Sequence, residues 1–109
     1  MQIRILSADD VRACVDMPAA IDAMREAFAA LSAQEATVPM RLALETEHGV
    51  SLFMPAHLRE SGNAGAKVVS VNPGNAARVL PAIHAVVLVL DVLTGRPTAL
   101  MDGTWLTAL

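Results

Sequence analysis

The hydrophobic positions of the chain follow two periods, and the change from one to the other falls near Pro39. Before Pro39, apolar side chains recur at steps of three and four residues, which is the period of an amphipathic helix. Four side chains form this stripe: Ile21, Met24, Phe28 and Leu31. The pattern predicts a helix that begins after Asp16 and fades near Gln34.

A shorter helix is predicted ahead of it, directly after a strand at residues 3–6. Ser7 and Asp10 have the spacing of a capping box, in which each side chain satisfies the backbone N–H of the other residue. The helix is expected to run to about Val15. Cys14 lies among apolar residues in this helix, so we interpret its side chain as packed.

After Pro39 the period shortens to two, which predicts strands. Five segments have this character: 40–46, 50–56, 64–72, 83–92 and 98–101. A turn at His48–Gly49 joins the first two into a hairpin. Segment 83–92 is apolar on both faces and should be central. The sequence therefore predicts an α+β fold, with two N-terminal helices packed on a mixed, mostly antiparallel sheet of five or six strands.

Composition narrows the class of protein. A chain of 109 residues fits one domain, 1–109. Its net charge of −3 argues against nucleic-acid binding, and no apolar run approaches the roughly 20 residues of a transmembrane helix. The single cysteine fits a reducing compartment, so we expect a cytoplasmic protein. A hydrophobic share of 54% indicates apolar surface that a partner covers, and we expect a homodimer formed through the sheet.

The sequence shows no common cofactor or metal motif. Its glycines never fall in the G-x-G-x-x-G or P-loop patterns. His48, His57 and His84 have no His or Cys partner at metal-ligand spacing. We therefore expect neither a cofactor nor a metal to bind this chain. A helix start at residues 102–104, capped by Asp102 or Thr104, leads into only five further residues, which we interpret as the sign of a truncated N-terminal fragment.

Lys67 is the charged residue whose position is hardest to explain as ordinary surface. It lies in the apolar segment AKVVSV, on the strand face of Val69 and Val71. A lysine on an inward face is costly unless an anion neutralises it. The alternative is a lysine that protects an edge strand from aggregation. Arg41 alternates with apolar neighbours in PMRLAL, where a solvated surface arginine is the simpler interpretation.

Three segments together resemble the N-terminal half of the ornithine cyclodeaminase/μ-crystallin family: AGAKVVSVNP, LPAIHAVVLVLD and TGRPTALMDGTWLTAL. The family pattern is G-x-K-x-V-x-x-x-P, then L-P-x-x-x-A, then T-G-x-P-x-A-x-x-D-G-x-x-L-T-A. Its order and spacing hold across residues 37–109. The resemblance implies that the chain is the substrate-binding and dimerisation domain of a two-domain enzyme. The Rossmann domain and the acidic catalytic residue of cyclodeaminases are not in this sequence.

The resemblance also implies roles for particular residues. Arg41 and Lys67 would bind the carboxylate of a small amino or imino acid, and Lys67 is a candidate for proton transfer. NAD or NADP is implied for the full-length parent, whereas this chain alone is not expected to be catalytic. Ala82 stands where cyclodeaminases often have threonine, which leaves dehydrogenase and imine reductase activities open. The alternative is a stand-alone small-molecule-binding or dimerisation module without catalysis.

Overall fold

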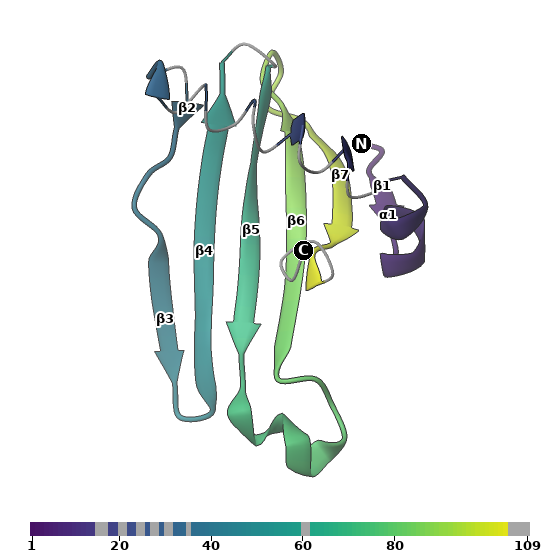
Figure 1. Cartoon of the computed structure of the whole chain (residues 1–109), viewed down its shortest axis with the longest axis vertical. Helices are drawn as coiled ribbons and strands as arrows, with labels where there is room; N and C mark the ends of the chain where they lie inside the picture. The colour runs from purple at the N-terminus through teal and green to yellow at the C-terminus, as the bar shows by residue number, and fades with distance from the viewer. Residues whose placement is uncertain are drawn as a thin grey trace.

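The computed structural model describes residues 1–14, 18–19, 22–23, 26, 29, 32–34, 36–59 and 62–104. These residues form a twisted sheet with a short helix beside it (Figure 1). The elements in chain order are β1 (Arg4–Leu6), α1 (Ala8–Cys14), β2 (Ala36–Thr37), β3 (Leu42–Thr46), β4 (Gly49–Leu58), β5 (Asn63–Val71), the 3-10 helix η1 (Pro73–Arg78), β6 (Ile83–Asp91) and β7 (Pro97–Asp102).

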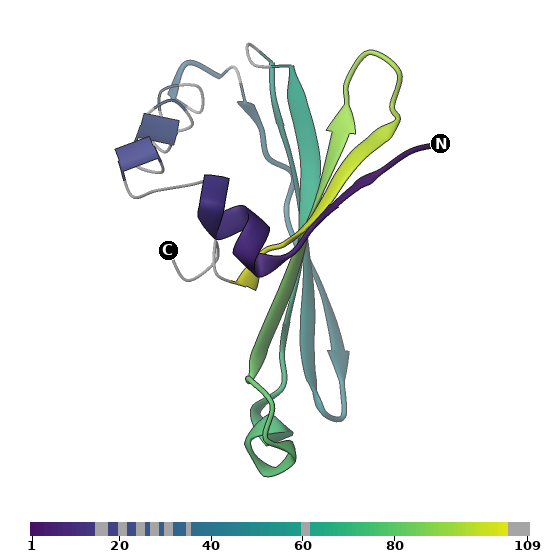
Figure 2. The ribbon, with the colours of Figure 1, turned by 90° about the vertical axis from the view of Figure 1, so that its right-hand side faces the viewer.

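The sheet has the strand order β1-β7-β6-β5-β4-β2, and β3 also pairs with β4. The pairs from β2 to β7 are antiparallel. From β3 to β7 each connection returns the chain beside the strand it has just left, whereas β2 pairs with β4. β1 comes from the start of the chain and pairs in parallel with β7. Figure 2 shows α1 on one side of the sheet, and no described element covers the other side.

The predicted arrangement of two helices on a five- or six-stranded sheet is wrong. The described residues hold seven strands in a mixed sheet and a single α-helix with defined bounds, α1. The strand that the sequence did not reveal is β2, whose two residues are too few to show an alternating pattern. Of the predicted second helix the structure describes only scattered residues, and its apolar stripe lies outside them.

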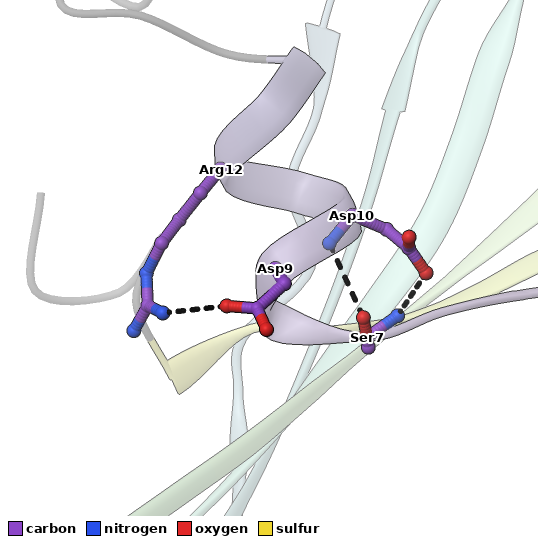
Figure 3. A network of polar contacts seen from close by, with 4 residues as sticks. All are labelled: Ser7, Asp9, Asp10 and Arg12. Atoms are coloured by element: carbon purple, nitrogen blue, oxygen red, sulfur yellow. Dashed lines mark hydrogen bonds and ion pairs between the residues drawn. The ribbon is translucent and has the colours of Figure 1, made fainter.

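Helix α1 begins as its capping box predicts (Figure 3). The Asp10 N–H donates to the Ser7 hydroxyl at 3.2 Å, and the Ser7 N–H donates to the Asp10 carboxylate at 2.9 Å. The helix buries Val11, which is 3% exposed, and ends at Cys14. The interpretation of Cys14 as packed is wrong, because the described helix is only two turns long and its last residue is exposed.

The hairpin of β3 and β4 is confirmed, but its turn lies one residue earlier than predicted. Thr46 pairs with Gly49, so Glu47 and His48 form the turn. Gly49 belongs to β4, where a Cβ atom would lie 2.2 Å from the carbonyl oxygen of Val71. Glycine at this position therefore allows the close approach of β4 and β5.

One face of the sheet carries large apolar side chains in contact with solvent. Leu42 pairs with Phe53 and Phe53 pairs with Val68, so their side chains lie in one row across three strands. Leu42 is 72% exposed and Phe53 is 39% exposed. We call this the apolar face.

No helix among the described residues is long and apolar enough to cross a membrane.

Candidate functional site

Lys67 lies in the middle of β5, on the face opposite the apolar face. It pairs with Met54 of β4 and with Val87 of β6, so its side chain projects between two apolar side chains. The residue is half-buried. Val69, two positions further on the same face, is 6% exposed. Lys67 therefore lies on the inward face that its spacing from Val69 predicted.

The position of β5 decides between the two interpretations of Lys67. β5 lies between β4 and β6 and has a partner along both edges. A lysine that protects an edge strand has no function there. The edge-strand interpretation is therefore wrong, and the carboxylate-binding role of Lys67 stays a prediction.

Lys67 lines an open depression of about 450 Å³ on β4, β5 and β6. Small residues form part of its surface, among them Ala56 and Gly65. Gly65 is required for strand packing, because a Cβ atom there would lie 2.2 Å from the carbonyl oxygen of Leu88. Lys67 is the one charged residue among the described residues that line the depression. The depression therefore combines a single positive charge with mostly apolar walls.

Arg41 is exposed and lies in the unpaired stretch between β2 and β3. The β3–β4 ladder ends where Leu42 pairs with Phe53. One further step along that ladder would bring Arg41 opposite Met54, and Met54 pairs with Lys67. Arg41 and Lys67 would then be two strand spacings apart, or about 10 Å between backbones, with both side chains on one face. In the structure Arg41 stays outside this ladder, so the two cations are not placed in one row of paired residues.

Neither cation is paired with an acidic side chain in the part of the chain that the structure describes. The ion pairs found there join Arg12 to Asp9 at 3.1 Å and His48 to Glu47 at 3.5 Å, all on exposed side chains. The described residues also contain no group of three or more metal-ligating side chains.

The residues that follow β7 make hydrogen bonds that the sequence did not predict. Asp102 accepts a hydrogen bond from the Thr104 N–H at 2.9 Å, whereas the helix that it was predicted to cap lies outside the described residues. The Thr104 hydroxyl accepts a hydrogen bond from the Ala85 N–H at 3.0 Å. The Gly103 N–H donates to the Ala85 carbonyl at 2.9 Å. Cross-strand contacts of this kind depend on register, which sequence spacing alone does not give.

The turns from strand to helix do not fit a dinucleotide. Such a ligand needs a glycine-rich turn whose free N–H groups point at its phosphates. At the start of α1, Asp10 already occupies the Ser7 N–H, and the hydrogen bonds from Ser7 hold the pKa of the Asp10 carboxyl below its ordinary value. After β7, Asp102 occupies the Thr104 N–H. A carboxylate at each of these two turns repels phosphate.

Comparison with known proteins identifies the class to which this fold and its lysine-containing strand belong. The model of the ornithine cyclodeaminase/mu-crystallin family matches residues 1–109. The chain therefore belongs to this family, as its sequence motifs predicted.

Three relatives illustrate the similarity. The alanine dehydrogenase of Archaeoglobus fulgidus is 38% identical over 109 residues, which are 100% of this chain and 33% of that protein. An archaeal alanine dehydrogenase dimer with bound NAD superposes with a TM-score of 0.94 at 37% identity, over 99% of this chain and 33% of the other. The Thermococcus litoralis Δ1-pyrroline-2-carboxylate reductase, in complex with NADH and L-proline, also gives 0.94, at 38% identity over 97% and 33%. This chain spans about a third of the length of these relatives.

Proposed function

We propose that this chain is the substrate-binding domain of a longer NAD(P)-dependent enzyme that acts on a small amino or imino acid. Lys67 and Arg41 bind the carboxylate of the substrate. The observation that carries the proposal is the position of Lys67, a half-buried lysine on a central strand with no acidic partner among the described residues. Burial of an unpaired charge is unfavourable, and a bound carboxylate removes that cost.

The two cations contribute differently to carboxylate binding. A guanidinium group donates two parallel hydrogen bonds to the two oxygens of a carboxylate, which fixes its plane. The ammonium group of Lys67 adds a compact charge with three donors. Met54 and Val87 flank Lys67 on the neighbouring strands, and apolar surroundings strengthen the attraction of an ammonium group for an anion. Together these groups would hold the carboxylate over the sheet and direct the remainder of the substrate into the apolar depression.

The names of the relatives indicate the reaction that the full-length parent would catalyse. Their names and titles describe alanine dehydrogenases and a Δ1-pyrroline-2-carboxylate reductase, with NAD or NADH bound. In such an enzyme the nicotinamide group exchanges hydride with the substrate. The nicotinamide cofactor would be held by a part of the parent that lies outside this chain. Lys67 would bind and orient the substrate and is a candidate to exchange a proton with its nitrogen.

The proposal can be tested by removing the charge of Lys67 in the full-length parent. Lys67→Met should weaken substrate binding by about 2–5 kcal/mol, because a bound carboxylate loses its charged partner. Arg96→Met is the matched control, since Arg96 is an exposed cation in the turn between β6 and β7. An unchanged Michaelis constant and turnover number in Lys67→Met would refute the proposal.

A second test uses the isolated chain, in which Lys67 is the single lysine. Isotopic labelling of lysine then gives one side-chain NMR signal that reports on this group alone. Titration with L-proline, the amino acid in the Thermococcus complex, should shift the signal, while prolinamide, which lacks the carboxylate, should not. Equal shifts with both compounds would contradict carboxylate recognition.

We also propose that the chain forms a homodimer through the apolar face of the sheet. Leu42, Leu44 and Phe53 are 72%, 56% and 39% exposed on strands that no described element covers. Isolated chains rarely leave so much contiguous apolar surface in water. A second copy of the chain, burying about 800 Å² on each subunit, would cover it.

A further inference from the structure

The outer edge of β4 is interrupted at Pro55. β3 pairs with β4 as far as Leu42 and Phe53, and pairing resumes in β2, where Thr37 lies opposite His57. Between these two ladders, four residues of the chain (38–41) run beside three residues of β4 (54–56) without pairing. Arg41 belongs to this unpaired stretch.

The register of the sheet gives the direction in which the backbone of Pro55 points. The Asn72 N–H donates to the Ala82 carbonyl at 2.7 Å and extends the ladder between β5 and β6. The backbone N–H and C=O groups of successive residues point to opposite edges of a strand. Since those of Asn72 point toward β6, those of Lys67 point toward β4. The backbone groups of Met54, which pairs with Lys67, therefore point toward β5. Pro55 is the next residue, and its backbone therefore faces the outer edge of β4, where residues 38–41 lie.

Proline has no N–H group to offer to that edge. Any other residue at position 55 would present a donor there, which could continue the β3 ladder past Leu42. Pro39 lies in the unpaired stretch and lacks an N–H as well. The interruption thus coincides with a missing N–H donor on each of the two adjoining segments. Segment 38–41 also has one residue more than segment 54–56 beside it, so its backbone does not have to be fully extended.

We infer that Pro55 is a positioning residue for Arg41. It keeps the backbone of Arg41 out of the β3–β4 ladder, so that the guanidinium group can move toward Lys67 and share its anion. A paired Arg41 would instead project perpendicular to the sheet, parallel to Lys67 and about 10 Å from it. The inference rests on the proposed carboxylate-binding role of these two cations.

The test is a double-mutant cycle in the full-length parent. Pro55→Val restores the N–H and keeps an apolar side chain of similar size on the apolar face. It should raise the Michaelis constant about tenfold, the size of a lost charged hydrogen bond, and change the turnover number by no more than about twofold. In an Arg41→Met background the same substitution should have no further effect. Pro97→Val, at the first residue of β7, is the control and should leave the Michaelis constant unchanged.

Hydrogen exchange supplies a readout that is independent of activity. The new amide of residue 55 should be protected in Pro55→Val, because it donates to the closed ladder. An unprotected amide, or a protected amide with an unchanged Michaelis constant, would overturn the inference. Equal losses from Pro55→Val in the wild-type and Arg41→Met backgrounds would also overturn it, by showing a general structural effect. If Arg41→Met itself leaves substrate binding unchanged, the proposed role of Arg41 fails, and the role of Pro55 fails with it.

Discussion

Ser51 and Ser70 lie opposite each other on β4 and β5, with their hydroxyl oxygens 2.6 Å apart. This hydrogen bond crosses the apolar face, half-buried between larger apolar side chains. A single substitution to alanine at either position leaves the other hydroxyl without its partner and should cost about 1 kcal/mol. Substitution of both serines by alanine should cost less than the sum of the two single changes. Urea unfolding of the wild type and these three variants at one protein concentration measures the coupling, and additive losses would contradict it.

The capping box of α1 should make the stability of the protein depend on pH in the acid range. The hydrogen bonds from Ser7 lower the pKa of the Asp10 carboxyl below its ordinary value. A carboxyl group whose pKa is lower in the folded state stabilises that state above its unfolded pKa. The stabilisation is therefore complete at neutral pH and is lost as the pH falls through the lower, folded value. Thermal unfolding between pH 6 and pH 2 should show this loss in the wild type.

Two variants isolate the capping contribution. Asp10→Asn removes the titrating group, so the acid part of its stability profile should be flatter than that of the wild type. Ser7→Ala removes the hydroxyl that accepts from the Asp10 N–H and should cost about 1 kcal/mol at neutral pH. Identical pH profiles for the wild type and Asp10→Asn would show that the carboxylate contributes nothing.

The apolar face should control the oligomeric state. Leu42→Asp introduces a charge at its exposed edge and should convert a dimer to a monomer, because an unpaired carboxylate in an interface loses its hydration. Leu93→Asp is the matched control, since Leu93 is 92% exposed in the turn after β6. Light scattering at micromolar concentration distinguishes the two masses. A wild-type mass near 11.5 kDa would rule out a stable dimer under those conditions.

Val79 should be replaceable with a gain in stability. Its backbone is in the left-handed region (φ 57°), which β-branched residues rarely adopt, and its side chain is 93% exposed. Asparagine tolerates this conformation, so Val79→Asn should raise the free energy of unfolding by about 1 kcal/mol. Val92→Asn is the control, because Val92 is a partly exposed valine without a positive φ. Equal effects of the two substitutions would show that the backbone of Val79 is not the cause.

The alternation of apolar and polar residues predicted most of the strands, and the boundaries of β5, β6 and β7 fall within a residue or two of the expected ones. The inward position of Lys67 was also visible, because a strand face can be inferred from the spacing to Val69. The order of the strands in the sheet could not be predicted, since the alternating pattern of a strand is compatible with several different neighbouring strands. β2 was not predicted, because its two residues are too few to show an alternating pattern. The interruption that leaves Arg41 unpaired depends on the direction in which the backbone of Pro55 points, and only the register of the sheet reveals that direction. The carboxylate-binding roles of Arg41 and Lys67 stay predictions.

The parallel pair of β1 and β7 has a consequence for how the protein folds. Arg4 pairs with Ala99, whereas β3 to β7 each pair with the strand that precedes or follows them in the chain. Adjacent hairpins close short loops quickly, while a contact between the two ends of the chain requires a large loss of chain entropy. On a ribosome, β3 to β6 can therefore assemble while β7 is still being made. β1 and α1 would dock last, so a mutation in β1 should speed unfolding more than it slows refolding.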